Sequence, residues 1–178
     1  NAYNSISRQH CLTQVAKHAT FKQVLPFLRQ IYAPASKLWV TLNSGKASMS
    51  SEEGAQQGDP LGPFFFSVGL QPILEAVQAC LDDNQSIGCV LAYLDDVLIA
   101  GPLEDVQRGF NTLKEASKGT GLSINLHKCS LFMSGNEQPL GELLHGIEVN
   151  REGIRLLGSP LGMTDEFEDN WCRTFVNG

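Results

Sequence analysis

The sequence predicts a mixed α+β fold, in which strands meet in hairpins and helices pack behind them. Three observations support this prediction. Apolar residues recur at helical spacing near the start, β-rich segments are joined by turn residues, and one long segment is apolar over most of its helical circumference. A chain of 178 residues with 42% hydrophobic and 18% charged residues can bury a proper core and is typical of globular proteins.

The predicted elements begin with two helices and a hairpin. In chain order we expect a helix over 6–19, a helix over 21–32, a hairpin of LWVTLN and the strand after the turn NSGK, a long buried helix over 63–81, a tight hairpin of GCVLAY and DVLIAG, an amphipathic helix in LEDVQRGFNTLKEASKGTG, and strand-like segments in LSINLHKCSLF, HGIEVN and GIRLLG. Ser5 or Ser7 can cap the first helix, and Pro26 either begins or bends the second. The acidic final segment, TDEFEDNWCRTFVNG, is expected to lead into a following domain.

Composition argues against several classes of protein. No run of 18 apolar residues occurs, so no membrane-spanning segment is predicted. The initial NAYNSISR lacks Met and the pattern of a signal peptide, which predicts a piece of a longer polypeptide that is not secreted. Five scattered cysteines without a CxxC pair favour a reduced intracellular compartment, the nucleus or cytoplasm, over a zinc site or a disulfide framework.

The formal net charge of −6 limits how the chain could bind a nucleic acid. Self-sufficient nucleic-acid binders usually carry a basic face that neutralises phosphates. Here the 13 lysines and arginines are spread along the chain, with no more than two in any short window. Positive charge for a nucleic acid would therefore have to come from other segments or from bound metal ions.

Two adjacent aspartates, Asp95 and Asp96, stand at the predicted turn of AYLDDVLIAG, among residues whose apolar character predicts burial. Burying a carboxylate costs several kcal/mol, so a positive partner is expected for this charge. Mg²⁺ takes oxygen ligands from one or two carboxylates and from substrate phosphates, and two such ions can assist phosphoryl transfer. The alternative is that both are ordinary turn residues, because Asp is common in turns.

A second polar motif, EEGAQQGDPLG, comes just before the long helix. Asp59 or Gly62, each followed by proline, can begin that helix, and free N–H groups at a helix start suit a phosphate or a sugar edge. Gly58 lets the backbone approach a ligand, and Gln57 can form a hydrogen bond there. The alternative is a solvent-exposed loop that only caps the helix.

Together these motifs resemble the sequence boxes of reverse transcriptases. AYLDDVLIAG is similar to the catalytic YxDD box of that family, and QGDPLGP to the box that precedes the long palm helix. GLSINLHKC, GIRLLGSPLG and the initial NAYNSISR resemble three further boxes, and all five stand in the family's order over about residues 1–162. The pairing of QGDP with LGSPLG is closest to the enzymes of non-LTR retrotransposons.

The resemblance implies a polymerase palm over residues 1–162, an antiparallel sheet that carries the YLDD hairpin and packs on helices. Residues 163–178 would then be the start of the thumb or a connecting segment, with fingers and thumb largely missing. The implied activity is RNA-directed DNA synthesis by two-metal nucleotidyl transfer, with Mg²⁺ or Mn²⁺ as its substitute. Its partners would be an RNA template, a DNA primer and deoxynucleoside triphosphates, and no membrane.

The resemblance also implies roles for the two aspartates. Asp95 would be a catalytic metal ligand, and Asp96 a weaker or more distant contributor to the same metal site. The family's first box carries an aspartate three residues before the position of Asn1, and in the family this residue bridges both metals. Without it, Asp95 and Asp96 provide half of the metal site, and the chain is expected to polymerise inefficiently.

Four further residues match functional positions of the family. Tyr3 stands at the aromatic position that packs under the incoming sugar, unless it is an ordinary core tyrosine. Gln57 and Gly58 would line the nucleotide and template side. Lys128 would donate a proton to the leaving pyrophosphate or neutralise phosphate, unless it is only a solvated lysine at a strand end.

Two other functions stay open on the sequence. The chain could be an inactive or domesticated retroelement remnant that acts only as a binding module. It could also belong to another palm polymerase, such as an RNA-templated RNA polymerase. The aromatic Tyr3 favours an enzyme that uses deoxynucleotides over an RNA-templated RNA polymerase, but this argument rests on the resemblance alone.

Overall fold

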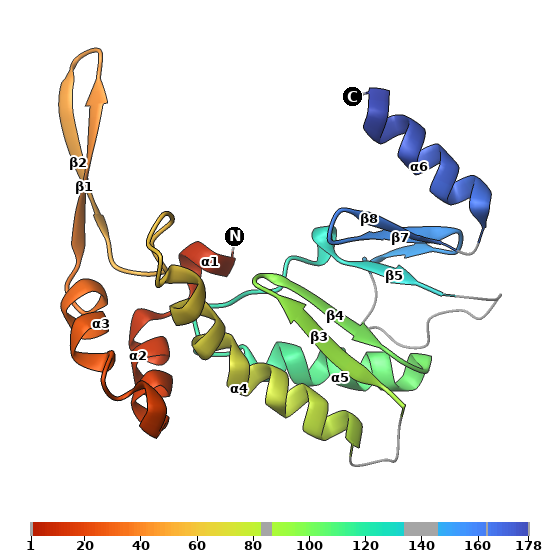
Figure 1. Cartoon of the computed structure of the whole chain (residues 1–178), viewed down its shortest axis with the longest axis horizontal. Helices are drawn as coiled ribbons and strands as arrows, with labels where there is room; N and C mark the ends of the chain where they lie inside the picture. The colour runs from red at the N-terminus through yellow and green to blue at the C-terminus, as the bar shows by residue number, and fades with distance from the viewer. Residues whose placement is uncertain (1, 83–86, 134–145, 163, 178) are drawn as a thin grey trace. The chain divides into compact units, whose positions relative to one another are not determined.

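Helices and short two-stranded sheets make up the protein, which confirms the predicted mixed α+β class (Figure 1). The structure is a computed structural model that describes residues 2–82, 87–133, 146–162 and 164–177. The chain divides into two units, Asn1–Ser123 and Ile124–Gly178, which are described separately.

The first unit contains the N-terminal helices, two hairpins and the long helix. Its elements are α1 (Ala2–Ser5), α2 (Arg8–Lys17), η1 (Ala19–Phe21), α3 (Leu25–Tyr32), β1 (Ser36–Leu42), β2 (Gly45–Ser51), α4 (Gly62–Asp82), β3 (Cys89–Tyr93), β4 (Asp96–Ala100) and α5 (Leu103–Ala116). Of the two candidate caps, Ser7 caps α2, because its hydroxyl oxygen accepts a hydrogen bond from the His10 N–H at 3.2 Å. Pro26 lies in the first turn of α3 and therefore begins that helix.

Helices α2 and α4 form the centre of the core. Gly69 allows their close approach, because a Cβ at that position would collide with the sulfur of Cys11 and lie 2.8 Å from Cδ1 of Ile6. Burial raises the pKa of the Cys11 thiol to about 12. The largest fully buried side chains are Ile6, Cys11, Val15, Leu28, Tyr32, Phe65, Phe66, Val77 and Leu81. Burying each large apolar side chain contributes about 1.5–3 kcal/mol relative to leaving it exposed.

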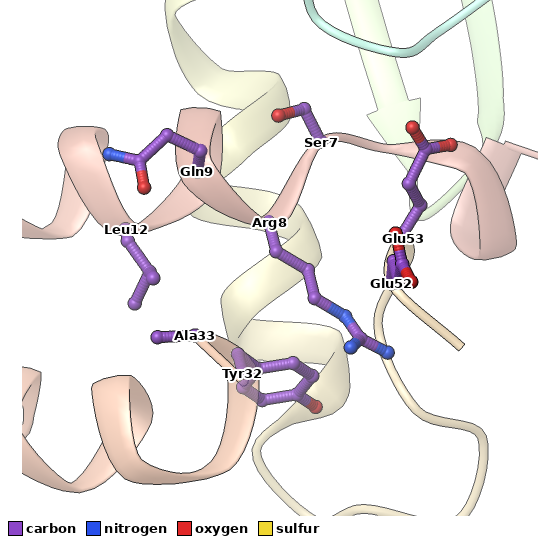
Figure 2. A pocket seen from close by; sticks show the side chains of 8 residues that line it. All are labelled: Ser7, Arg8, Gln9, Leu12, Tyr32, Ala33, Glu52 and Glu53. Carbon is purple, nitrogen blue, oxygen red and sulfur yellow. The ribbon is translucent and has the colours of Figure 1, made fainter. Parts of the chain in front are cut away.

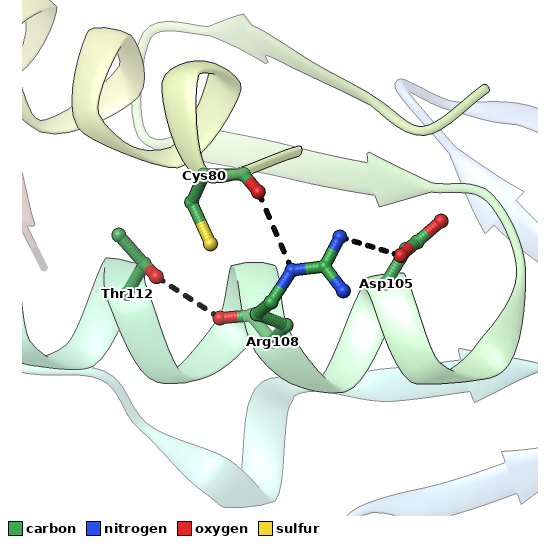
Figure 3. A network of polar contacts seen from close by, with 4 residues as sticks. All are labelled: Cys80, Asp105, Arg108 and Thr112. Carbon is green, nitrogen blue, oxygen red and sulfur yellow. Dashed lines mark hydrogen bonds and ion pairs between the residues drawn. The ribbon is translucent and has the colours of Figure 1, made fainter. Parts of the chain in front are cut away.

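Helix α4 includes Pro72 and confirms the predicted long helix, although it is less buried than expected. Helix α5 packs against it through Gly109, where a Cβ would lie 3.5 Å from side chains of α4. Arg108 of α5 joins the two helices (Figure 3): its Nε donates to the Cys80 carbonyl oxygen at 3.3 Å, and its Nη2 lies 2.6 Å from Oδ1 of Asp105. The last four carbonyl groups of a helix have no hydrogen-bond partner within the helix, and the guanidinium of Arg108 donates to one of these groups in α4.

By length and composition, α4 could cross a membrane, and it is the one such helix in the described residues. This character is weak evidence for a membrane span, because the core helix of a globular domain shares it. The helix contacts α2, α5 and β3, and less than half of its most apolar window, 44%, is buried.

Both predicted hairpins of the first unit form, with antiparallel registers from Ser36↔Ser51 to Leu42↔Gly45 and from Cys89↔Ala100 to Tyr93↔Asp96. Strand β3 contacts α4, and β4 contacts α5, so the second hairpin rests on both helices. The β1–β2 hairpin extends away from the helices (Figure 1), and its side chains are almost all exposed.

The second unit contains η2 (Leu126–Lys128), β5 (Ser130–Phe132), β6 (Glu148–Asn150), β7 (Gly153–Leu156), β8 (Ser159–Gly162) and α6 (Asp165–Asn177). The strand predicted in LSINLHKCSLF is shorter than expected, because a 3₁₀ turn precedes β5. The strands predicted in HGIEVN and GIRLLG are confirmed as β6 and β7, although the first residue of HGIEVN lies outside the described residues. Helix α6 was not predicted. It begins beside Thr164, whose Oγ1 accepts from the Phe167 N–H at 3.2 Å.

Candidate functional site

Asp95 and Asp96 lie at the tip of the β3–β4 hairpin. Tyr93 pairs with Asp96 across the strands, so Leu94 and Asp95 are the two central residues of the turn. Leu94 has φ 51°, and Asp95 does not have a positive φ. A positive φ at the first central position alone is the signature of a type II′ turn, where glycine is preferred and leucine is strained. The turn therefore holds an unfavourable leucine directly beside the first carboxylate.

The two carboxylates project from a surface, and the predicted burial around them is wrong. Asp95 and Asp96 are exposed, and the neighbouring side chains of Leu91 and Tyr93 are 61% and 66% exposed. The cause is the alternation of side chains along the strands. The face with Val97 packs towards the core, while Leu91, Tyr93 and Asp96 lie on the other face, where Leu91 and Tyr93 are exposed.

The donor set suits a hard divalent cation, since Asp95 and Asp96 offer only carboxylate oxygens. No group of three or more histidine, cysteine, aspartate or glutamate side chains that could hold a metal occurs among the residues that the structure describes. Two adjacent carboxylates at an exposed turn thus fit a metal ion that completes its coordination with other oxygens, such as those of a nucleotide.

Tyr3 packs beside the start of α4, and Gln57 bonds the next residue, Asn4. The Tyr3 ring lies 5.4 Å from the Phe66 ring, and its hydroxyl occupies the space that a side chain at Gly62 would need. Gln57 Nε2 donates to Oδ1 of Asn4 at 3.4 Å. Desolvation, with a smaller effect of the Asp59 carboxylate, raises the pKa of Tyr3. Tyr3 is half-buried, so it combines the packing of a core tyrosine with an accessible edge.

Gly58 is exposed and has φ 87°, with no atom within 4 Å of where a Cβ would lie. Glycine is therefore needed for the backbone conformation and not for space within the chain. The structure thus brings Tyr3, Gln57 and Gly58 to one region, the loop that leads into α4, and their roles towards a nucleotide stay predictions.

Asp59 closes the start of α4. Its Oδ1 accepts from the Leu61 N–H at 3.0 Å, and its carbonyl oxygen accepts from the Gly62 N–H at 2.9 Å. The Tyr32 hydroxyl donates to the other carboxylate oxygen, and burial together with this bond raises the pKa of Tyr32. Asp59 thus closes the turn just before α4, which begins at Gly62. The expectation of free N–H groups at this helix start is wrong for Leu61 and Gly62, because the N–H groups of both residues donate to Asp59.

Arg8 is a buried residue that the sequence analysis missed, and it is 5% exposed. Its guanidinium donates to the carbonyl oxygens of Gly54 at 2.9 Å and Ser51 at 2.8 Å, and to Oγ of Ser51 at 3.1 Å. The guanidinium also lies 5.7 Å from the centre of the Tyr32 ring. Desolvation lowers the pKa of Arg8, against smaller opposing effects of Tyr32 and Glu52.

Arg8 lines a cavity of about 260 Å³, which Figure 2 shows between α2, the end of α3 and the loop after β2. Tyr32, Glu52 and Glu53 also line it. A signal for Arg8 was present in the sequence. It precedes Leu12 by four residues and Val15 by seven, which places an arginine on the apolar face of α2.

Lys128 belongs to the second unit, and the aspartates belong to the first. Lys128 ends the 3₁₀ turn η2, its N–H donates to the Asn125 carbonyl oxygen at 3.0 Å, and its side chain is exposed. Its role as a proton donor therefore stays a prediction.

Residues 1–161 match the family described as reverse transcriptase (RNA-dependent DNA polymerase). The Retrotransposable element SLACS 132 kDa protein of Trypanosoma brucei gambiense is 31% identical over 134 residues, 74% of this chain. The Transposon TX1 uncharacterized 149 kDa protein of Xenopus laevis is 27% identical over 147 residues, 76% of this chain. The match spans 11% of the length of each relative. The predicted resemblance to the reverse transcriptases of retrotransposons is confirmed.

Proposed function

The chain belongs to the reverse transcriptase (RNA-dependent DNA polymerase) family, and from this premise we propose that it carries the catalytic palm of an enzyme that copies RNA into DNA. One observation supports this most directly. Asp95 and Asp96, the two residues of the YxDD-like motif that can hold a metal, lie exposed at the tip of a hairpin that rests on α4 and α5. A rigid support for exposed carboxylates is what a positioned metal site requires.

The proposed roles follow from the chemistry of each side chain. Asp95 and Asp96 would hold Mg²⁺, or Mn²⁺ in its place, which when bound activates the primer 3′-hydroxyl and stabilises the charge that develops on the phosphate. Tyr3 would offer the edge of its ring to the deoxyribose of the incoming nucleotide. Gln57 and Gly58 would bind along the nucleotide and template side, Gln57 through its amide and Gly58 through its accessible backbone.

Lys128 would neutralise or protonate the pyrophosphate that leaves. The partners of the reaction would be an RNA template, a DNA primer and deoxynucleoside triphosphates. The alternative that we weigh against this proposal is an inactive remnant that binds without catalysis. The two differ in whether the carboxylates bind a metal ion that supports extension of a primer.

Titration of the chain with Mn²⁺, followed by electron paramagnetic resonance, tests the metal site. We expect Asp95→Asn to weaken Mn²⁺ binding at least tenfold and Asp96→Asn to weaken it less. The matched control is the double variant Asp165→Asn, Glu166→Gln, which removes two adjacent exposed acidic side chains from the start of α6. That control should leave Mn²⁺ binding unchanged.

Extension of a DNA primer on an RNA template provides the second measurement, with Asp95→Asn expected to reduce the product to background. Equal Mn²⁺ affinity in the Asp95→Asn variant and the unmodified chain would refute the metal assignment. Tight Mn²⁺ binding at Asp95 without any extension would favour the inactive remnant.

A further inference from the structure

The β1–β2 hairpin has a polar face that the proposed chemistry leaves unused. The register of the two strands places six side chains on this face, namely Lys37, Trp39, Thr41, Lys46, Ser48 and Ser50. We call it the Trp39 face. All six residues are exposed, and Trp39, at 68%, is the most exposed aromatic side chain in the described part of the chain. Tryptophan is enriched at binding interfaces, so an exposed indole on a strand indicates a contact with a partner.

The opposite face of the hairpin has a different composition. It carries Leu38, Val40, Leu42, Ala47 and Met49. An apolar face of this kind suits contact with protein, whereas burying the Trp39 face in a protein interface would require two lysines to lose water. The two faces therefore suit different partners. The Trp39 face suits a partner that offers negative charge to the lysines and a flat surface on which the indole can stack.

The charge of the hairpin differs from that of the whole chain. Residues 36–51 contain two lysines and no acidic residue, while the chain has a net charge of −6. The two ion pairs that the described residues form do not include Lys37 or Lys46. Glu52, which follows β2, accepts a hydrogen bond from the Ser50 hydroxyl at 2.9 Å. The six side chains of the Trp39 face thus carry two positive charges and no negative one, with Glu52 beside Ser50 at the base of the hairpin. Towards the turn, the face is complementary to a polyanion.

Its spacing also suits a nucleic-acid strand. Lys46 lies opposite Thr41, four residues along the strand from Lys37. At about 3.3 Å per residue the two lysines are about 13 Å apart along the hairpin, with Trp39 between them. This distance spans a few nucleotides. Cationic side chains that contact the backbone and an aromatic ring that stacks on a base are the components of single-stranded nucleic-acid sites.

We propose that the Trp39 face binds a single-stranded nucleic acid, with the Trp39 indole stacked on a base and with Lys37 and Lys46 contacting phosphates on either side. The proposal rests on the proposed function only in taking a nucleic acid as the partner of this chain. It requires neither a metal ion nor an active polymerase site.

Tryptophan fluorescence tests the proposal directly, because the sequence contains two tryptophans, Trp39 and Trp171. In a Trp171→Phe variant, Trp39 is the only source of the signal. We expect oligo(U) RNA and oligo(dT) DNA to quench it, without metal ions or nucleoside triphosphates, and a matched duplex to quench it less because its bases are already stacked. A difference between the two oligonucleotides would identify whether the face prefers an RNA template or a DNA strand.

Variants on the two faces complete the experiment. We expect Trp39→Ala to weaken oligonucleotide binding, measured by anisotropy of a labelled strand, about tenfold. Each of Lys37→Gln and Lys46→Gln should lower the slope of log affinity against log salt concentration by about 1. Leu38→Thr and Val40→Thr, on the opposite face, should change neither quantity.

The proposal is overturned if Trp39 fluorescence does not respond to an oligonucleotide, or if Trp39→Ala binds as the unmodified chain does. It is also overturned if the fluorescence changes with protein concentration alone, since the face would then be a contact between copies of the chain. In these cases the Mn²⁺ titration of Asp95 still decides the proposed function independently.

Discussion

The two hairpins of the first unit are both antiparallel, but they have different supports. The β3–β4 hairpin lies along α4 and α5, and the methyl group of Ile99 would be 3.2 Å from a Cβ at Gly109. The β1–β2 hairpin is tied to the rest of the unit near its base, where Arg8 of α2 bonds Ser51 and where the amide of Gln56, in the loop before α4, donates to the Ser36 hydroxyl at 3.1 Å. One hairpin is held along its length, and the other near one end.

This difference indicates how each hairpin can function. A turn that must hold two carboxylates in fixed positions needs a support that resists movement, and packing on two helices provides it. A hairpin held near one end presents both faces to solvent and to partners. Apolar residues in a strand therefore do not determine its burial, since Leu91 is exposed in the hairpin on α4 and α5 and Trp39 is exposed in the other. The burial of an apolar side chain in a strand depends on whether a helix lies against the face of the hairpin that carries it.

The largest effect is expected from breaking the anchor of the β1–β2 hairpin. Arg8→Met keeps the length of the side chain but removes its three hydrogen bonds to Gly54 and Ser51. Hydrogen bonds to charged groups contribute about 1.5–3 kcal/mol each, partly offset by the removal of a buried charge. We expect the free energy of unfolding to fall by about 3 kcal/mol, measured by urea denaturation followed by circular dichroism.

Lys17→Met is the matched control, because it removes an exposed positive charge from the last turn of the same helix. It should change stability by less than about 1 kcal/mol. Equal losses in the two variants would show that Arg8 contributes only its charge and does not anchor the hairpin.

The next largest effect is the loss of stability when an apolar side chain is shortened in each hairpin. Ile99→Ala removes apolar contact with α5, and we expect a loss of about 2 kcal/mol because Ile99 is only partly buried. Val40→Ala in the β1–β2 hairpin should lose less than about 0.5 kcal/mol, since Val40 is exposed. The same urea denaturation measures both. A loss at Val40 as large as that at Ile99 would contradict the difference in support.

Local patterns were sufficient to predict most elements of the fold. The turn residues of NSGK, the period of the apolar residues in α4 and α5, and the tight turn of YLDD each depend on neighbours in sequence. Helix α6 was missed although Asp165 and Glu166 follow a possible cap at Thr164, because its acidic composition was taken as the edge of a domain. That signal was available in the sequence.

The features that could not be predicted depend on contacts between distant residues. Arg8 bonds Ser51 and Gly54, more than 40 positions later, and no local pattern specifies those acceptors. The exposure of Asp95 and Asp96 depends on which face of their hairpin meets α4 and α5. The prediction for Tyr3 came from a family resemblance alone, whereas the polar motif before α4 also indicated Gln57 and Gly58. The grouping of the three residues beside the start of α4 is a property of the folded chain.

The smallest effect concerns the strained turn that carries the carboxylates. Leu94 and Leu157 have nearly the same backbone angle, φ 51° and φ 50°, at the turns of the β3–β4 and β7–β8 hairpins. A left-handed conformation costs about 1–2 kcal/mol for such a residue, while glycine adopts it freely but gains entropy in the unfolded chain. We therefore expect Leu94→Gly and Leu157→Gly each to raise stability by about 0.5 kcal/mol. If the strained turn positions the carboxylates, only Leu94→Gly should weaken Mn²⁺ binding, by about threefold. If both variants bind Mn²⁺ as the unmodified chain does, the support by α4 and α5 is sufficient and the strain at Leu94 has no part in the site.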